Sequence, residues 1–258
     1  MNIAILGAGN MGGALAKGLL QSGLPPESLT LTCRNPEKHP ELQALGVRLL
    51  TDNALAVQAA SVVIVAVKPW QVEEVLRTLA PVLRPETLVL SVAAGVTVAQ
   101  LRALLPPEVQ AVRTMPNTAV ALNEGVIAIA SDTSSALERA QSLLAPLGLI
   151  VPVEESKMDA LTALAGCGIA HALRFLRAAQ CAGVQMGLTA DQSAAVFAQV
   201  MAGAVALMRQ PGATAESEID RICTPGGLTV RGLNALEQAG FSAATIRGLL
   251  ASLPKEKQ

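Results

Sequence analysis

The first 150 residues alternate short aliphatic runs with longer amphipathic segments, and no other feature constrains the fold as strongly. This alternation is typical of βαβ units, in which helices cover both faces of a parallel sheet. The expected strands are Asn2–Leu6, Leu29–Cys33, Val47–Leu50, Val62–Val67, Leu88–Val92, Gln110–Thr114 and Val126–Ala130. Val62–Val67 is apolar without alternation, as expected for a central strand buried on both faces. We therefore predict an α/β fold with a doubly wound, mostly parallel N-terminal sheet.

Beyond about Val153 the strand-like runs stop, and Ala-rich segments with helical spacing follow. Apolar residues recur at three- and four-residue steps, which predicts a long helix over Glu155–Met186 and a second over Asp191–Arg209. Pro and Gly residues divide the remainder into shorter helices. We expect a sheet domain over residues 1–152 and an all-α domain over residues 153–258.

The predicted helical domain is unusually apolar. Helices that are apolar nearly all round must be buried, and about a hundred residues cannot bury every face within one bundle. The sequence therefore predicts a homo-oligomer formed through the C-terminal domain.

Composition excludes several classes of function. Lys+Arg 19 against Asp+Glu 20 leaves a formal net charge of −1, and the chain has one Trp, three Phe and no Tyr, which argues against a nucleic-acid-binding protein. We see no uninterrupted apolar run of about 18 residues, so no membrane span is expected. The N-terminus lacks a signal-peptide pattern, which favours a cytoplasmic location. Four dispersed cysteines and two histidines predict neither a metal site nor disulfides.

A glycine motif follows the first expected strand and opens the first helix: Gly7, Ala8, Gly9, Asn10, Met11 and Gly12. In a GxGxxG motif, the first glycine allows a tight turn, the second lets the backbone approach a pyrophosphate and the third permits close helix–strand packing. The glycines could instead serve only the sharp turn. Their position at the start of a βαβ alternation favours dinucleotide binding and a Rossmann-type domain.

The end of the second expected strand indicates which dinucleotide binds. An acidic residue there would hold a ribose 2′-hydroxyl, but the sequence continues Cys33, Arg34, Asn35. A guanidinium matches a phosphate bidentately, so Arg34 favours NADP over NAD, with NADPH preferred to NADH. The alternative is a solvated surface arginine.

Loops after the later strands carry further candidates. Ala66, Val67, Lys68 and Pro69 form one loop, Ala93, Ala94 and Gly95 a second, and Met115–Thr118 a third. Ligands of open α/β sheets lie beyond the carboxyl ends of the strands, so these loops are expected to line the cofactor. In the helical half, Thr224–Thr229 opens a helix, and its glycines and hydroxyls suit a carboxylate, although a simple capped turn fits equally well.

In their order along the chain, these segments resemble the pyrroline-5-carboxylate reductase family. The resemblance rests on Ile5–Gly12, Ala66–Pro69, Ser91–Thr97, Met115–Thr118, Val184–Leu188 and Thr224–Val230. It implies a Rossmann domain followed by a helical domain through which subunits dimerise. It also implies NAD(P)H-dependent reduction of L-1-pyrroline-5-carboxylate to L-proline, the last step of proline biosynthesis.

The resemblance also assigns residues. The implied cofactor contacts are Gly7, Ala8, Gly9, Asn10, Met11, Gly12, Arg34, Asn35, Asn53, Ala66, Val67, Lys68, Pro69, Ala93, Ala94, Gly95 and Asn117. The implied substrate contacts are Thr224, Gly226, Gly227, Leu228 and Thr229. Thr229 is the catalytic candidate, as a hydrogen-bond partner of the imine nitrogen or its carboxylate. A protonated cyclic imine is already electrophilic, so hydride transfer requires mainly positioning.

The chain departs from the family pattern at several positions. Cys167, Ile169 and His171 stand in a segment that is usually G-S-G-P-A followed by an aromatic residue, Ala119 replaces a common Pro, and Leu228 precedes the last Thr. Two alternatives therefore stay open. One is a divergent imine or hydroxyacid reductase with another small carboxylate substrate, and the other is a non-catalytic NADP-binding regulatory paralogue.

Overall fold

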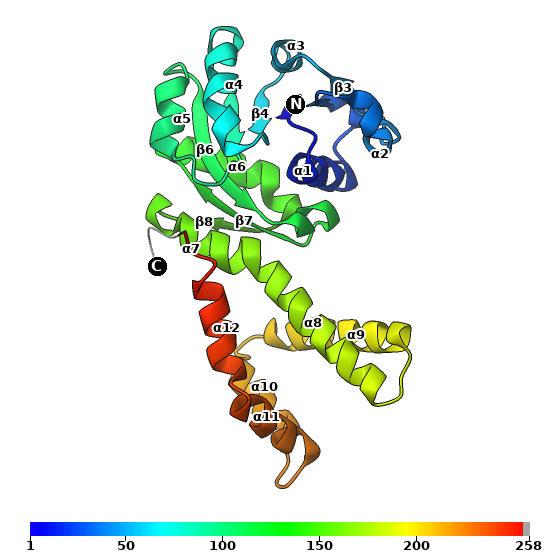
Figure 1. Cartoon of the computed structure of the whole chain (residues 1–258). Helices are drawn as coiled ribbons and strands as arrows, with labels where there is room; N and C mark the ends of the chain where they lie inside the picture. The colour runs from blue at the N-terminus through cyan, green and yellow to red at the C-terminus, as the bar shows by residue number, and fades with distance from the viewer. Residues whose placement is uncertain (255–258) are drawn as a thin grey trace. The chain divides into compact units, whose positions relative to one another are not determined.

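The computed structural model describes residues 1–254 and contains an eight-stranded sheet followed by helices (Figure 1). The strand order is β3-β2-β1-β4-β5-β6-β7-β8. The strands are β1 (Ile3–Leu6), β2 (Leu29–Thr32), β3 (Arg48–Leu50), β4 (Val62–Val65), β5 (Leu88–Ser91), β6 (Gln110–Pro116), β7 (Gly125–Ala130) and β8 (Gly148–Pro152). The predicted doubly wound, mostly parallel sheet is confirmed. Strand β8 was not predicted, because this short edge strand follows the preceding helix with only a 3-10 turn between them.

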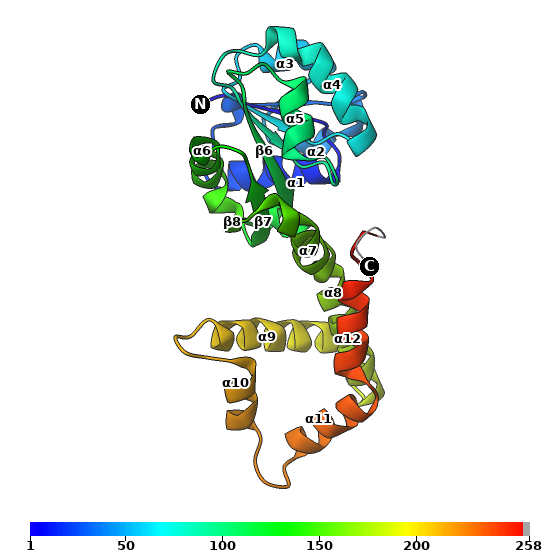
Figure 2. The ribbon, with the colours of Figure 1, turned by 90° about the vertical axis from the view of Figure 1, so that its left-hand side faces the viewer.

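Helices cover both faces of the sheet, as Figure 2 shows for α4 and α6. The helices of this half are α1 (Asn10–Gln21), α2 (Pro40–Gln43), α3 (Asn53–Val57), α4 (Val72–Leu79), α5 (Val98–Leu104) and α6 (Ser134–Leu144). Apolar residues of α1 and α6 pack with Ile3 and Ile5 on one face of β1. Those of α3, α4 and α5 pack with Ala4 and Leu6 on the other face. The aliphatic runs are therefore buried on both faces, as the pattern of the sequence indicated.

The register at one side of the sheet determines where the chain leaves it. Strand β7 is antiparallel to β6, and β8 is parallel to β7. Arg113 of β6 pairs with Ser91, the last residue of β5, and also with Ala130, the last residue of β7. Pro152, the last residue of β8, pairs with Ile129. The chain therefore leaves β8 level with the carboxyl end of β5.

The segment after β8 is helical but not one continuous α-helix. It consists of a 3-10 turn (Glu155–Lys157), α7 (Met158–Leu161), a π-helix (Thr162–Cys167) and α8 (Gly168–Gln185). By its contacts the chain divides into two compact units, Met1–Gly166 and Cys167–Gln258, of which residues 255–258 are outside the described part. This division lies 14 residues (166 − 152) beyond the boundary expected at residues 152/153.

The second unit continues with α9 (Ala190–Met208), α10 (Ala215–Ile222), α11 (Leu228–Gln238) and α12 (Phe241–Leu250). Helix α9 is long and apolar enough, by length and composition, to cross a membrane, although Asp191 and Gly203 interrupt its apolar run. One such helix is weak evidence for a span, because a helix that packs against another protein passes the same test. Apolar side chains of α9 are exposed within the single chain, among them Val196, Val200 and Met208.

Candidate active site

A cleft of about 780 Å³ lies at the carboxyl ends of β1, β2, β4 and β5. It is lined by Gly7, Ala8, Gly9, Asn10, Met11, Thr32, Cys33, Arg34, Asn35, Lys38, His39, Thr51, Asn53, Ala66, Val67, Lys68, Pro69, Gln71, Val75, Val92, Ala93 and Ala94. The structure thus brings most of the predicted cofactor residues together at one edge of the sheet. Ligands of open α/β sheets bind at this edge.

The glycine loop has the geometry that its motif predicts. Gly7 has φ +105°, and a Cβ there would lie 2.8 Å from the Ala66 carbonyl oxygen. A Cβ on Gly12 would overlap the Gly7 carbonyl oxygen, whereas one on Gly9 would meet no atom within 4 Å. Gly9 is also the N-cap of α1, so the helix begins at the cleft without a capping side chain. Gly12 is therefore a packing residue, while the backbone at Gly9 is open to an anion.

The charged side chains that line the cleft are all basic. Arg34, Lys38 and Lys68 contribute three formal positive charges, His39 lies beside them, and no Asp or Glu is among the lining residues. The chain as a whole carries a net charge of −1. A local excess of positive charge in such a cleft suits a polyanionic ligand.

Asp52 lies between two lining residues but does not contribute to the cleft. Its Oδ1 accepts hydrogen bonds from Ala54 N (2.7 Å) and Leu55 N (3.3 Å), which caps the N-terminus of α3. Asn53, a predicted cofactor residue, opens this helix and lines the cleft. The carboxylate is thus engaged by its own helix and is not among the lining residues of the cleft.

Lys68 and Pro69 follow β4 and enter a short 3-10 turn, Pro69–Gln71. The Lys68 backbone N–H donates to Gln71 Oε1 at 3.2 Å, which fixes the turn. Trp70, the only Trp of the chain, is 78% exposed next to the lining residue Pro69. It is therefore a natural fluorescent reporter of this cleft.

Cys33 is the one cysteine in the cleft lining. Burial raises the pKa of its thiol above the ordinary value; a hydrogen bond from the Asn35 backbone opposes this shift and the negative charge of Glu37 adds to it. The thiol is therefore protonated at neutral pH and a poor nucleophile.

Three predicted cofactor residues are not among the lining residues. Gly12 packs beneath the loop, and Gly95, with φ +80°, lies just beyond Ala94. Asn117 is buried, and its side chain is engaged by the backbone: Oδ1 accepts from Ala119 N (3.2 Å) and Nδ2 donates to Ala165 O (3.2 Å). The first bond caps the turn after β6 and the second connects the strand end to the π-helix Thr162–Cys167, so Asn117 contributes to the structure of the strand end.

The predicted substrate loop lies in the second unit, before α11. Gly227 is the N-cap of α11, and its N–H donates to Thr224 O at 2.9 Å. Gly226 has φ +70°, and a Cβ on Gly227 would crowd Thr224 Oγ1 at 2.5 Å. Thr229 is exposed in the first turn, and Leu228 is 78% exposed. The loop thus offers a helix N-terminus flanked by two hydroxyls, which suits a carboxylate.

Comparisons with known proteins cover the same regions. A family model described as pyrroline-5-carboxylate reductase dimerisation matches residues 155–258, and one described as NADP oxidoreductase, coenzyme F420-dependent, matches residues 2–95. Pyrroline-5-carboxylate reductase 2 of Dictyostelium discoideum is 33% identical, over 100% of this chain and 92% of that protein. The pyrroline-5-carboxylate reductase of Methanosarcina acetivorans is 33% identical over 99% and 97%. The chain belongs to the pyrroline-5-carboxylate reductase family.

Solved structures of that family have the same fold. Pyrroline carboxylate reductase of Plasmodium falciparum, with NADP bound, superposes with a TM-score of 0.88 at 26% identity, covering 98% of this chain and 95% of that one. The Coxiella burnetii enzyme gives 0.86 at 28% identity, over 97% and 95%. A 3-hydroxyisobutyrate dehydrogenase of Mycobacterium tuberculosis, with a TM-score of 0.55 at 21% identity, shares only the fold. The resemblance seen in the sequence is therefore confirmed.

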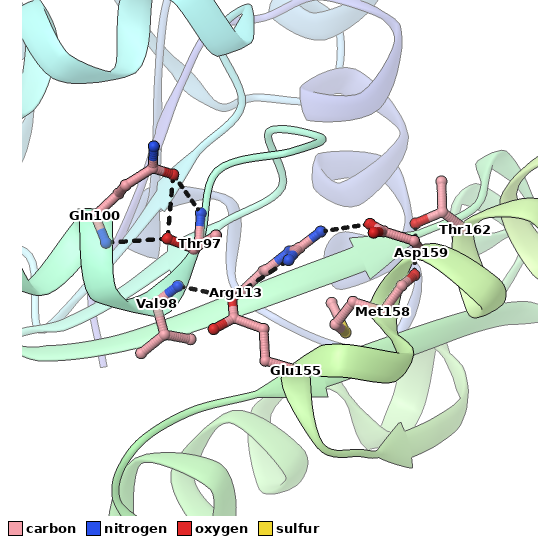
Figure 3. A network of polar contacts seen from close by, with 8 residues as sticks. All are labelled: Thr97, Val98, Gln100, Arg113, Glu155, Met158, Asp159 and Thr162. Carbon is pink, nitrogen blue, oxygen red and sulfur yellow. Dashed lines mark hydrogen bonds and ion pairs between the residues drawn. The ribbon is translucent and has the colours of Figure 1, made fainter. Parts of the chain in front are cut away.

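This member of the reductase family also contains a polar network that the sequence analysis missed (Figure 3). Arg113 of β6 bonds to Glu155 at 3.3 Å and to Asp159 at 3.2 Å. A basic residue in the middle of the strand Gln110–Pro116, and two acids four residues apart, were available signals. The cleft residues Lys38 and His39, which follow the predicted contacts Arg34 and Asn35 in the chain, were also missed.

Proposed function

We propose that this chain reduces L-1-pyrroline-5-carboxylate to L-proline with NADPH. The observation that carries the proposal is the similarity to named pyrroline-5-carboxylate reductases over essentially the whole chain. The cleft at the glycine loop and the hydroxyl-flanked start of α11 support it, since the reaction needs one site for a dinucleotide and one for a small carboxylate.

The charge of the cleft supports a preference for NADPH over NADH. A 2′-phosphate adds about −1.5 to −2 charge at pH 7. We assign Arg34 to that phosphate, with Asn35, Lys38 and His39 beside it in the lining. Without a lining carboxylate, the site lacks the acidic residue that typically binds an NAD ribose.

The remaining cofactor contacts follow from the lining. The amides of Gly9, Asn10 and Met11 at the start of α1 hold the pyrophosphate, because those of Gly7 and Ala8 already donate to Thr32 O (3.1 and 2.9 Å). The small residues Ala93 and Ala94 let the backbone approach the nicotinamide. Lys68 and Pro69 border the same cleft, and Lys68 orients the cofactor edge rather than donating a proton.

The proposed reaction requires few catalytic groups from the protein. Bound NADPH supplies a hydride, which adds to the imine carbon while the π electrons of the C=N bond move to the nitrogen. The nitrogen already carries its proton in the reactive iminium form, so no Tyr or carboxylate pair is required. We assign the substrate carboxylate to Thr224 and the Gly226–Leu228 backbone, and a hydrogen bond from Thr229 to the ring nitrogen or the carboxylate.

We also infer that the chain is a cytoplasmic homodimer assembled through its helical unit. The family model for dimerisation covers residues 155–258, and α9 exposes a set of apolar side chains in the single chain. We place the functional boundary after β8, with residues 1–152 serving the cofactor and 153–258 the substrate and the partner subunit.

The test is to follow loss of NADPH absorbance with pyrroline-5-carboxylate and the purified protein. We expect turnover that falls at least tenfold in Thr229→Ala and is unchanged in Thr245→Ala, whose hydroxyl bonds to Phe241 O within α12. NADPH binding without turnover on this substrate would refute the proposal and favour the regulatory paralogue. Turnover only with 2-hydroxy or 2-keto acids would favour the hydroxyacid alternative.

A further inference from the structure

Arg113 forms the centre of a buried ionic network in the first unit (Figure 3). Its side chain is 5% exposed. Nη1 donates to Glu155 Oε1 at 3.3 Å and Nη2 to Asp159 Oδ1 at 3.2 Å. Arg113 Nε finds no acceptor within the described residues, so these two carboxylates are the compensation that the structure shows for the buried charge.

Glu155 makes a second contact, with the start of α5. Its Oε1 also accepts a hydrogen bond from Val98 N at 2.8 Å. Val98 is the first residue of α5, and an N–H group in the first turn of a helix has no partner within the helix. The Thr97 hydroxyl accepts from Gln100 N at 3.1 Å, so Thr97 and Glu155 each satisfy one N–H group of the first turn. Arg113 holds the Glu155 carboxylate in place for this contact.

Helix α5 is preceded by the loop Val92–Thr97, which lines the cleft through Val92, Ala93 and Ala94. The start of this loop is also fixed. Thr114 Oγ1 donates to Ser91 O at 2.9 Å, and Ala93 N donates to Ser91 Oγ at 3.4 Å. Strand β6 thus supports both ends of the loop, through Thr114 at Ser91 and through Arg113 and Glu155 at Val98.

We infer that Glu155, oriented by Arg113, is a positioning residue for the loop Val92–Thr97. The inference rests on the proposed function, in which this loop faces the nicotinamide. Phosphate binding is assigned to the glycine loop after β1 and to the turn after β2, which this network does not contact. Releasing the loop therefore lowers the rate of hydride transfer and leaves NADPH affinity nearly unchanged.

The decisive variant is Glu155→Asp. It keeps the negative charge near Arg113, whose bond to Asp159 is untouched, but shortens the side chain by one methylene, which withdraws from Val98 N the oxygen that Val98 and Arg113 share. Glu155→Ala removes both contacts, and Glu155→Gln keeps an acceptor for Val98 N without the charge. Glu154→Ala, at the exposed neighbouring position, is the matched control.

We expect kcat to fall about tenfold in Glu155→Asp and Glu155→Ala, because a small misplacement of a reacting group is costly. The dissociation constant for NADPH is expected to stay within about twofold, and Glu155→Gln and Glu154→Ala to keep kcat within about threefold of the parent. A kcat of Glu155→Asp within about twofold of the parent would overturn the inference, as would a loss of kcat matched by a loss of NADPH affinity.

Amide hydrogen exchange provides a readout that does not depend on the reaction. In Glu155→Asp, peptides covering residues 92–98 are expected to exchange faster, while those covering β1 and the start of α1 keep the parent rate. Unchanged exchange over residues 92–98 refutes the positioning role. If the parent itself fails to oxidise NADPH with pyrroline-5-carboxylate, the proposed function fails, and the exchange result still decides whether Glu155 positions the loop.

Discussion

Alanine substitutions in the glycine motif can distinguish a glycine that lets the backbone approach the cofactor from one that allows α1 to pack against its neighbours. Gly9→Ala places a methyl group in open space at the start of α1, where no atom lies within 4 Å. Gly12→Ala places the same methyl group against the Gly7 carbonyl oxygen. Gly13, one position further along α1, also has nothing within 4 Å and does not line the cleft, so Gly13→Ala is the matched control.

The expected effect of Gly9→Ala on stability is close to zero. Gly9 has φ −77° and ψ −170°, which alanine adopts without strain. Reduced freedom of the unfolded chain stabilises the variant by about 0.4–1 kcal/mol. Alanine is a poorer N-cap than glycine, and the loss is about 0.5–1 kcal/mol. The free energy of unfolding should therefore stay within about 0.5 kcal/mol of the parent, whereas overpacking in Gly12→Ala costs about 1–3 kcal/mol.

The expected effect of Gly9→Ala on NADPH affinity is large. A methyl group at this point pushes the pyrophosphate away from the amides at the start of α1. Losing one hydrogen bond to a charged group costs about 1.5–3 kcal/mol. At about 1.4 kcal/mol per tenfold, the dissociation constant for NADPH rises about 10- to 150-fold.

The assay combines urea unfolding with NADPH titration followed through the fluorescence of Trp70. Gly13→Ala should be more stable by about 0.5–1 kcal/mol, because it removes a glycine from a helix, and should bind NADPH like the parent. The reasoning is refuted if Gly9→Ala binds NADPH within twofold of the parent, or if its loss of affinity is accompanied by an equal loss of stability.

The remaining predictions concern the rest of the cleft and the helical unit. Arg34→Ala and Lys38→Ala should each raise the KM for NADPH about tenfold and leave the KM for NADH unchanged. Lys17→Ala, which removes an exposed positive charge outside the cleft lining, is the control. Equal effects on the KM values of both cofactors would contradict this. Burial raises the pKa of the Cys33 thiol, so less thiolate is present at pH 7 and alkylation, followed by mass spectrometry, should be slower than for free cysteine. The rate should increase as pH rises and should fall when NADPH is bound. Fast alkylation at pH 7 would disprove this. Val200→Asp, at a position 52% exposed on α9, should convert the dimer to monomer in sedimentation experiments, and an unchanged mass would remove α9 from the interface.

Local sequence patterns predicted the parts of the structure that depend on local interactions. The parallel strands follow from continuous aliphatic runs, and the glycine loop follows from steric requirements within residues 7–12. The cleft therefore lies where the motifs indicated. Lys38 and His39 also line the cleft; they stand at the end of a 3-10 turn, Pro36–Lys38, whose course relative to the cleft the sequence does not indicate.

Long-range contacts explain what the patterns did not predict. Helical periodicity extends continuously from Glu155, so the sequence predicts a domain boundary directly after β8. The structure joins Glu155–Gly166 to the first unit, and ion pairs between Arg113 and acids more than 40 residues away contribute to that join. Asn117 was predicted to contact the cofactor from its motif, whereas its side-chain amide accepts a hydrogen bond from Ala119 N and donates one to Ala165 O. These contacts cannot be predicted from the local sequence.

The segment Arg34–His39 has a consequence for evolution and redesign. It supplies three of the basic side chains at the cleft, yet no residue in it is buried, and the first core residue after it is Leu42. Exchanging this segment for a neutral or acidic one changes the charge at one end of the cleft without touching the packed layers. Coenzyme choice in this chain can therefore drift, or be reprogrammed, independently of the fold that carries it.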